Sequence, residues 1–540
     1  MKKDTQNRIP PKADFPYSVI SVNFLIIVIL FIIFFYYPNA LGEDLYYHLK
    51  IASLIKGSGL SVIQDMRWFQ LTTWSQYPAD LSLGFHLILV PLLTCFSPIV
   101  SIKILGITLI LLFVNIFYWI LHSEGAKVKP LWIFLLLLIS TFFLYRLAIV
   151  RPFIISISFS LLIFASLIKG KKWLFILTCI LFPFFYTGWL QIFILLFFWI
   201  ASQLLIIRKF RDLSLILIAI ISVVAGLILR PDFPNILYLT YQQIVDLLFL
   251  NFKGIDLNVG IGQRTADIFF FQDNIIGILL MTVTLLMNYF NFRFLRDETK
   301  KITLLTLSLI TVFYFIWSIE SVRFIEYWIP FSILFTALSV TYFSECEIAS
   351  RHWSMKLISQ MKSGIRDRWI WKVIFVLFLV AISYHGPLYV LKSIKHSKPV
   401  TAFQAEAQWL AENTLEKSNV FITSWDSFSR LFFYNHHNNY TVGMDPVFFY
   451  LRDPERFWLW RNITEHTCVS TTPIDECPEG MSEPGLIAAT IKSQFDSDYI
   501  FSNNYSVYFP FVMMMVKNPE IFHFIMSGEG SFLFSIDPSI

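Results

Sequence analysis

Two adjacent acids, Glu43 and Asp44, stand where the first apolar run of the sequence gives way to a polar loop. His48 follows Asp44 by four residues, and the aromatic pair Tyr46 and Tyr47 lies between them. A carboxylate in this position could hold a divalent metal ion against a phosphate, or act as a base toward an acceptor hydroxyl. Acids at the start of a helix also occur for a structural reason, because they cap free N–H groups and complement the helix dipole. Both interpretations remain open on spacing alone.

Two arginines, Arg146 and Arg151, lie five positions apart between two later apolar runs. The guanidinium group presents fork-shaped donors that match the oxygens of a phosphate. Arginines at helix ends also extend toward lipid headgroups. The pattern therefore fits a phosphate site and a position at the membrane surface equally well.

Arg323 and Glu326 are three residues apart, at the start of another apolar run. Residues with this spacing are neighbours on one helix face, so the two charges could simply neutralise each other. Glu326 falls inside the apolar boundary, where an unpaired carboxylate is costly and usually has a function. A pair that lines a water-filled cavity fits both interpretations, and the position of Glu326 slightly favours a functional one.

The C-terminal region contributes Trp425 and Asp426, which follow a strand-like stretch, and Asp445, which follows another. Acids directly after strands often line a cleft in α/β domains. They also form ordinary Asx-turns, which is the commoner explanation for a single acid. Trp425 could stack against a sugar, although tryptophan more often packs in a core.

The chain has 540 residues, of which 56% are hydrophobic and only 15% charged. In soluble globular proteins about a quarter of all residues are charged, so the low charged fraction here predicts that lipid surrounds most of the chain. The net charge of +5 is spread over short loops and does not indicate nucleic-acid binding. Apolar runs near the length of a bilayer crossing predict about eleven transmembrane helices. These runs are 18–37, 101–121, 131–147, 152–168, 172–186, 188–206, 213–229, 270–290, 302–318, 325–343 and 371–390.

The loops between these runs predict an orientation. Short cytoplasmic loops of membrane proteins are rich in lysine and arginine. With the N-terminus in the cytoplasm, every dense cluster of cations faces that side, provided that the apolar stretch 82–98 stays outside as an interfacial or re-entrant helix. No small-residue cleavage site follows the first run, so we expect it to remain as an anchor. The style of the sequence indicates a bacterial inner membrane.

The expected organisation is a transmembrane domain over 1–390, with a long first outer loop at 38–100, followed by a soluble periplasmic domain over 391–540. Helical spacing over 402–415 and short strand-like stretches at 419–423, 440–442, 499–502 and 531–536 predict a mixed α/β domain. Cys468 and Cys477 both fall in this domain, and outside the cytoplasm such a pair is expected to form a disulfide. The predicted fold class is a polytopic α-helical membrane protein with a C-terminal α/β extracytoplasmic domain.

The stretch Asp44-Leu45-Tyr46-Tyr47-His48-Leu49 resembles the Asp-x-Tyr-Tyr-His motif of oligosaccharyltransferase catalytic subunits, which belong to the GT-C class of membrane glycosyltransferases. A long first outer loop ending in Tyr77-Pro78-Ala79-Asp80, Arg323 in a late outer turn and Trp425-Asp426 in a C-terminal α/β domain are similar to that family too. The resemblance implies an inverting transferase that uses a polyprenyl-phosphate- or pyrophosphate-linked sugar at the outer leaflet. It implies that Asp44 is the main catalytic or metal-binding acid and that Arg323 contacts the lipid phosphate or the acceptor.

The chain departs from that family in two places. The turn that holds Arg146 and Arg151 lacks the family's second acidic motif, and its Trp-Trp-Asp motif is reduced to Ser424-Trp425-Asp426. A glycan, a lipid or a protein hydroxyl is therefore as plausible an acceptor as asparagine, and arginines could replace a Mg²⁺ or Mn²⁺ ion as counter-charges. A polytopic transporter and a polysaccharide polymerase or ligase remain alternatives. Against transport, the spans show no repeat of two halves, and the outer domain is large.

The sequence thus predicts Asp44 and Glu43 as catalytic acids, with Asp44 as the ligand if a metal is used. The predicted partners are a polyprenyl-phosphate-linked sugar donor, membrane lipids and the acceptor. The predicted substrate-binding residues are His48, Arg146, Arg151, Arg323, Glu326, Trp425 and Asp426.

Overall fold

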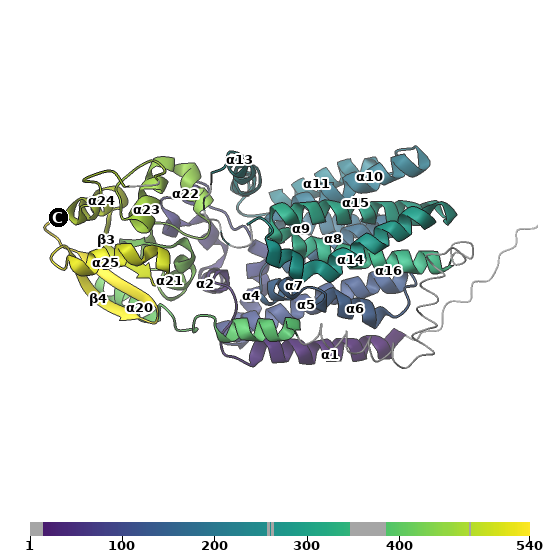
Figure 1. The fold of residues 1–540 in the computed structure, drawn as a ribbon, viewed down its shortest axis with the longest axis horizontal. Coiled ribbons are helices and arrows are strands. Elements are labelled where there is room, and N and C mark those ends of the chain that lie inside the picture. Colours follow the sequence, from purple (N-terminus) through teal and green to yellow (C-terminus); the bar gives the residue numbers. More distant parts are fainter. Residues whose placement is uncertain (1–14, 256, 258–259, 261–263, 346–384, 475–476) are drawn as a thin grey trace, which may run out of the picture.

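The computed structural model describes residues 15–540 except 256, 258–259, 261–263, 346–384 and 475–476. It has two parts, which are visible in Figure 1. Long helices run side by side in a bundle, and a smaller part of mixed helices and strands lies at one end of that bundle. The outward faces of many bundle helices are apolar, as a lipid environment requires.

Within the described residues, five helices are long and apolar enough to cross a membrane, or up to six if one bent pair counts as a single span. The predicted number of about eleven spans is therefore not confirmed. Several further helices of the bundle are apolar but shorter, and most of the expected run 371–390 lies outside the described residues. The bundle helices are α1 (Phe15–Phe35), α5 (Pro98–Ser123), α8 (Phe153–Lys169), α9 (Lys172–Phe185), α10 (Gln191–Ile207), α11 (Ser214–Ile228), α14 (Ile268–Asn291), α15 (Glu298–Glu320) and α16 (Ile325–Glu345).

The expected apolar run 131–147 does not form one straight helix. The chain forms α6 (Lys129–Leu138) and α7 (Thr141–Ala148), which are bent by 81° relative to each other. Ser140 starts the second helix, because its hydroxyl oxygen accepts a hydrogen bond from the Phe143 N–H at 3.1 Å. The Asp273 carboxylate on α14 accepts from the Ser140 hydroxyl at 3.1 Å and from the Phe142 N–H at 2.9 Å, which holds the break in place. Hydropathy alone cannot detect such a bend, since both halves are apolar.

The loop after α1, which the sequence predicts to be the first outer loop, folds into short helices at the junction between the two parts of the molecule. Aromatic rings pack there in a continuous layer; Tyr47 contacts Phe69, Trp74 and Phe432 with ring centroids 6.2–6.3 Å apart. Such pairs stabilise a structure by about 0.5–1.5 kcal/mol each beyond the burial of their area. The elements of this loop are α2 (Asp44–Ser58), η1 (Gly59–Gln64), η2 (Arg67–Phe69), α3 (Thr73–Gln76) and α4 (Leu83–Cys95).

A five-stranded sheet with the order β2-β1-β3-β5-β4 organises the C-terminal part. The strands are β1 (Asn419–Ile422), β2 (Asn439–Tyr440), β3 (Ser497–Asn503), β4 (Phe522–Gly528) and β5 (Ser531–Ile536). Strand β1 pairs in parallel with β2 and β3, whereas β5 is antiparallel to β3 and β4. The sequence prediction missed β4, an edge strand in which several side chains are exposed. The sheet is accompanied by α20 (Gln404–Asn413), α21 (Phe428–Tyr434), α22 (Pro446–Arg452), α23 (Pro454–His466), α24 (Pro484–Phe495) and α25 (Phe509–Lys517).

The expected pairing of Cys468 with Cys477 is present in the C-terminal part. The two sulfur atoms are bonded at 2.03 Å, and the Cα atoms are 5.7 Å apart. This separation lies in the ordinary range for a disulfide.

Candidate active site

Three arginines and three carboxylates from distant parts of the chain gather where the outer loop, the bundle and the C-terminal part meet. We call them the arginine–carboxylate cluster. Its members come from α2, from α7 and the turn before α8, from the start of α16, and from the residue before α22. They are Asp44, Arg146, Arg151, Arg323, Glu326 and Asp445.

The deepest contact of this cluster joins Arg146 to Glu326. The Arg146 Nε donates to Glu326 Oε1 at 2.7 Å, and the Nη2 of the same guanidinium bonds to the same oxygen. Both side chains are buried. Glu326 is therefore paired with Arg146 from another helix rather than with Arg323, its neighbour three residues away. Arg146 is also not at the lipid surface, because the bend before α7 carries it into the protein.

Asp44 forms an ion pair with Arg151, with 2.9 Å between the Asp44 Oδ2 and the Arg151 Nη2. Asp44 is the first residue of α2, and Arg151 directly precedes Pro152 at the start of α8. The turn that brings them together needs glycine at position 42, whose φ is +91°. A Cβ atom there would also lie 2.9 Å from the Ile149 Cγ2, so the close approach of the two segments excludes a side chain.

Arg323 lies in the short helix η7 (Val322–Phe324) and interacts electrostatically with Asp44, Glu326 and Asp445. Asp445 accepts a hydrogen bond from the Val447 N–H at 3.1 Å and so starts α22. The pKa of Asp445 is raised to about 6, mainly by burial and also by the nearby Asp44, although the Val447 N–H and Arg323 act in the opposite direction. Asp445 is thus the acid by which the C-terminal part reaches the cluster.

Several buried polar atoms of the cluster have no hydrogen-bond partner within the described part of the chain. They are the Nε of Arg151, the Nε of Arg323 and the Oε2 of Glu326. Buried donors and acceptors of native proteins are nearly always satisfied, by protein, water or ligand. Two unsatisfied guanidinium donors beside one carboxylate fit an anion with several oxygen atoms, such as a phosphate.

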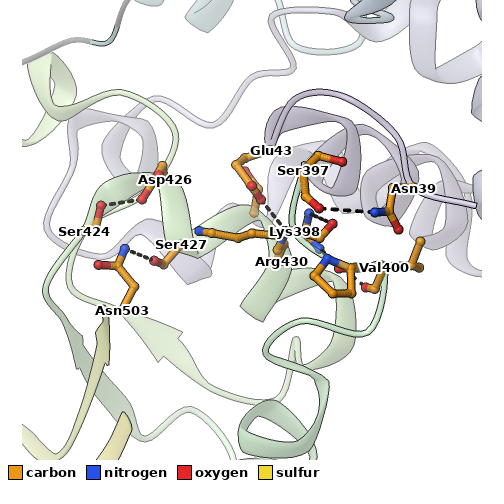
Figure 2. A network of polar contacts seen from close by, with 12 residues as sticks. Asn39, Glu43, Ser397, Lys398, Val400, Ser424, Asp426, Ser427, Arg430 and Asn503 are labelled. Atoms are coloured by element: carbon orange, nitrogen blue, oxygen red, sulfur yellow. Dashed lines mark hydrogen bonds and ion pairs between the residues drawn. The ribbon is translucent and has the colours of Figure 1, made fainter. Parts of the chain in front are cut away.

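Glu43, the neighbour of Asp44, has a different partner. Figure 2 shows it beside Arg430, which comes from α21 in the C-terminal part. The Arg430 Nε bonds to Glu43 Oε2, and its Nη1 donates to the Pro399 carbonyl at 2.7 Å. The guanidinium carbon also lies 4.1 Å from the centre of the Tyr46 ring. Glu43 therefore faces the junction between the two parts rather than the cluster.

Trp425 and Asp426, in η8 (Trp425–Ser427), lie apart from the cluster contacts. The Asp426 carboxylate accepts hydrogen bonds from Ser424, as Figure 2 shows, and from the Tyr505 hydroxyl at 2.7 Å. The Trp425 ring lies beside Gly260 of the outer segment before α14, 3.4 Å from where a Cβ would stand. Their role in selecting the acceptor stays a prediction.

His48 lies one helical turn after Asp44 and is buried. Its Nδ1 is 2.7 Å from the Nε2 of His86, and the Nδ1 of His86 is 2.6 Å from the Asp80 carboxylate. The sequence prediction missed His86, although a polar residue in the apolar stretch 82–98 was itself a signal, since buried polar groups need a partner. It quoted Asp80 only as part of a family motif.

A divalent metal does not fit this site. Asp44, the ligand that the family resemblance suggested, is paired with Arg151. In the part of the chain that the structure describes, no group of three or more histidine, cysteine or acidic residues could hold an ion. Mg²⁺ and Mn²⁺ favour several oxygen ligands around one point, so we derive no step from a metal.

An apolar groove of about 280 Å³ opens between α4 and α9. Gly84, Leu87, Ile88, Leu181, Phe184 and Phe185 line it. The next residue, Tyr186, interacts electrostatically with Arg146, Arg151 and Arg323. One end of the groove therefore lies close to the cluster.

Solved structures of three membrane enzymes share this fold. The apo oligosaccharyltransferase of Archaeoglobus fulgidus matches with a TM-score of 0.60 and 13% sequence identity, over 97% of this chain and 75% of that chain. ArnT from Cupriavidus metallidurans bound to undecaprenyl phosphate has a TM-score of 0.55 and 12% identity, over 97% and 98%. Arabinofuranosyltransferase AftD from Mycobacteria has a TM-score of 0.52 and 11% identity, over 96% and 40%. No protein-family model matches the chain, and no curated protein matches its sequence.

These neighbours are glycosyltransferases of the GT-C type, and this chain has their fold. The expected resemblance is thereby confirmed at the level of architecture. Identities of 11–13% establish the fold alone, so the reaction must be argued from the arginine–carboxylate cluster.

Proposed function

We propose that the protein is a glycosyltransferase that moves a sugar or glycan from a polyprenyl-(pyro)phosphate carrier to a glycan, lipid or protein acceptor. The observation that carries this proposal is the pair of buried Nε donors of Arg151 and Arg323, which have no hydrogen-bond partner among the described residues. Two neighbours support it, because the archaeal oligosaccharyltransferase has been solved with a dolichol-phosphate and ArnT with undecaprenyl phosphate. A phosphate on a membrane lipid would meet this protein where the bundle meets the outer loop.

In this proposal the donor phosphate binds between Arg151 and Arg323. Arg146 stays with Glu326 and fixes the position of α7 against α16. The first isoprenoid units occupy the groove between α4 and α9, because its lining is almost entirely apolar. The groove and the two arginines thus separate recognition of the lipid chain from recognition of the phosphate.

The chemistry follows from these positions. Asp44 accepts a hydrogen bond from the acceptor nucleophile and orients it toward the anomeric carbon. A new bond forms between the nucleophile and that carbon while the bond to the phosphate oxygen breaks, and attack from the opposite face inverts the configuration. The electron pair leaves with the phosphate, whose growing negative charge Arg151 and Arg323 stabilise.

The C-terminal part roofs this site and selects the acceptor. Asp445 contributes its charge next to Arg323, and Trp425 with Asp426 lies farther out beside the segment that contains Gly260. A planar indole ring suits stacking on a sugar or an aromatic acceptor group.

The proposed location is the inner membrane, with the N-terminus in the cytoplasm and the C-terminal domain in the periplasm. The division into a membrane domain over 1–390 and a soluble domain over 391–540 belongs to this proposal. Reporter fusions after Lys398 should report outside, and fusions after Lys129 inside. The opposite result at either position would overturn the orientation.

The test is transfer of label from radiolabelled polyprenyl-phosphate sugars in membranes that contain the protein. We expect label to reach an acceptor with the wild type and to be lost with Asp44→Ala at matched expression. Arg296→Ala is the matched control, because Arg296 is exposed in the short turn between α14 and α15. Equal transfer with Asp44→Ala would remove Asp44 from the mechanism. No transfer in any sample, across several sugars, would contradict the proposed function.

A further inference from the structure

A buried row of hydrogen-bonded side chains begins on α2, one helical turn after Asp44. It starts at His48 on α2, continues through His86 on α4 and ends at Asp80 in the loop before α4. Both links are short, 2.7 Å and 2.6 Å, and all three side chains are buried. A histidine has one donor and one acceptor when neutral, so the partner at one end of the row decides which nitrogen carries the proton at the other end.

The inner end of the row is fixed by the surroundings of Asp80. Its Oδ1 accepts a hydrogen bond from the Ser82 N–H at 2.9 Å, and its Oδ2 faces the Nδ1 of His86. Burial raises the pKa of Asp80, but His86 and the Ser82 N–H more than offset this, so that the pKa is lowered and the group stays a carboxylate. Because the Asp80 carboxylate oxygen can only accept a hydrogen bond, the His86 Nδ1 must carry the proton.

Within the described part of the chain, this carboxylate forms no ion pair with an arginine, although Arg230 lies near enough to lower the pKa of Asp80. The nearest arginine, Arg230, donates to both oxygens of Asp232, at 2.8 Å and 2.7 Å. The Asp232 Oδ2 in turn accepts from the Asp80 backbone N–H at 2.9 Å. The buried group of Asp80, Asp232 and Arg230 therefore carries one excess negative charge. A proton that arrives on His86 would balance this charge.

At His48, the other end of the row, the surroundings do not favour a positive charge. If the His86 Nδ1 carries the proton, its bare Nε2 must accept from the His48 Nδ1–H, and the His48 Nε2 is left as an acceptor. Burial, together with His86 and Arg151, lowers the pKa of the His48 imidazole well below its usual value. A positive charge is therefore disfavoured at His48, whereas the Asp80 carboxylate lies 2.6 Å from the His86 Nδ1 and can balance a charge there.

We propose that His48 is a catalytic residue that takes the proton of the acceptor nucleophile at its Nε2, and that His86 and Asp80 hold this proton as a buried ion pair. The inference rests on the proposed glycosyl transfer. As the nucleophile bonds to the anomeric carbon, its proton moves to the His48 Nε2, and the His48 Nδ1 proton moves to the His86 Nε2. His86 becomes an imidazolium beside the Asp80 carboxylate, and the electron pair of the broken bond leaves with the phosphate. Asp44 orients the nucleophile, while His86 and Asp80 are positioning residues.

The decisive variant is Asp80→Asn, which nearly preserves shape. The asparagine oxygen must face the Ser82 N–H, so its NH₂ group faces the His86 Nδ1 and demands a bare nitrogen there. The protons of both rings then move to Nε2, and His48 becomes a donor toward the site. Asp65→Asn is the matched control, because Asp65 is an exposed acid of the same outer loop.

The first readout is the ¹⁵N spectrum of histidine-labelled full-length protein, assigned with His48→Asn and His86→Gln. We expect both rings to carry the proton on Nδ1 in the wild type and in Asp65→Asn, and on Nε2 in Asp80→Asn. An unchanged pattern in Asp80→Asn, or an imidazolium at His86 in the resting wild type, would overturn the proposal. This readout needs no substrate, so it decides the proton positions even if no sugar donor is ever found.

The second readout is transfer from the radiolabelled donor used above. Asp80→Asn should lower kcat about 10²–10⁴-fold and leave KM within about threefold, because only the transition state loses an interaction. His48→Asn should give the same loss, since its amide can replace the Nδ1 donor but not the Nε2 base. A kcat near wild type in a folded Asp80→Asn or His48→Asn protein would overturn the proposal. No transfer with the wild type would contradict the proposed function instead.

Discussion

The neighbouring acids Glu43 and Asp44 both meet an arginine, yet the two pairs are built differently. Arg430, the partner of Glu43, is 1% exposed, bonds to several backbone carbonyl groups and stacks on Tyr46. Arg151, the partner of Asp44, keeps a buried Nε without a partner in the described part of the chain. A satisfied pair holds two parts of a protein together, whereas an unsatisfied pair is a place for a ligand. Glu43 and Asp44 are thus adjacent in the sequence, yet Glu43 makes a structural contact and Asp44 makes a candidate catalytic one.

Arg323→Ala removes one of the two arginines proposed to bind the phosphate. Its effect on transfer should be larger than that of Arg430→Ala, Asp445→Asn or Glu43→Gln. Transfer should fall about 10²–10³-fold, because the leaving phosphate loses a charged donor. The unfolding midpoint of the purified protein should fall less than in Arg430→Ala, because the Arg323 Nε makes no hydrogen bond within the described part of the chain and only the electrostatic interactions with Asp44, Glu326 and Asp445 are lost. Arg323→Lys should recover little activity, because lysine lacks the fork-shaped donors. A large fall in the unfolding midpoint with near-normal transfer would instead make Arg323 a structural residue.

Arg430→Ala removes the structural ion pair between Arg430 and Glu43. The free energy of unfolding should fall by about 2–3 kcal/mol, because Glu43 is left at the junction without its charged partner. Transfer per folded molecule should fall less than for Arg323→Ala, and thermal unfolding with a parallel transfer assay measures both. Arg296→Ala serves as the control for loss of an exposed arginine. Unchanged stability in Arg430→Ala would show that the two parts do not depend on this contact.

Asp445→Asn tests how the free energy of unfolding depends on pH through the Asp445 carboxyl group. The pKa of Asp445 is raised from 3.8 to about 6, so the folded protein binds this proton more tightly than the unfolded chain. The resulting stability is fully present below pH 3.8 and is lost as pH rises through about 6. Between pH 4 and 7 the wild type should therefore lose about 1–3 kcal/mol relative to Asp445→Asn. Chemical unfolding at several pH values measures this, and a constant difference would contradict it.

Glu43→Gln should have the smallest effect. The glutamine oxygen can still accept from Arg430, and Glu43 is partly exposed, so the cost in stability should be below about 1 kcal/mol. Transfer should stay within about threefold of the wild type, as the Glu43 side chain faces away from the arginine–carboxylate cluster. A loss as large as that of Asp44→Ala would return Glu43 to the pair of catalytic acids that the sequence predicted.

Much of the architecture could be read from apolar runs, but not the path of each helix. The run 131–147 gave no sign of its 81° bend, because that bend depends on Ser140 and on Asp273 from a later helix. The strand β4 was missed for a related reason, since its exposed side chains do not give the pattern of a buried strand. Local sequence patterns predict which residues are buried better than they predict where a helix bends.

The candidate site was predictable as a set of residue types but not as a set of pairs. Arg323 and Glu326 looked like partners because they are three residues apart, yet Glu326 bonds to Arg146 from 180 residues earlier. Likewise Asp445, rather than Asp426, interacts with Arg323, although both acids follow strands. Sequence spacing cannot rank such pairings, because a buried charge takes whichever partner the packing of helices brings near it.

The sequence by itself determined that most of this chain is apolar, that Asp44 opens the loop after the first apolar run, and that Cys468 and Cys477 can form a disulfide. These properties depend on composition and on short distances along the chain. Only the tertiary structure decided which carboxylate meets which arginine, which guanidinium donors have no partner within the described residues, and that His48 is joined to Asp80 through His86. The physical reason is the cost of burying a charge, which only contacts between distant segments can offset.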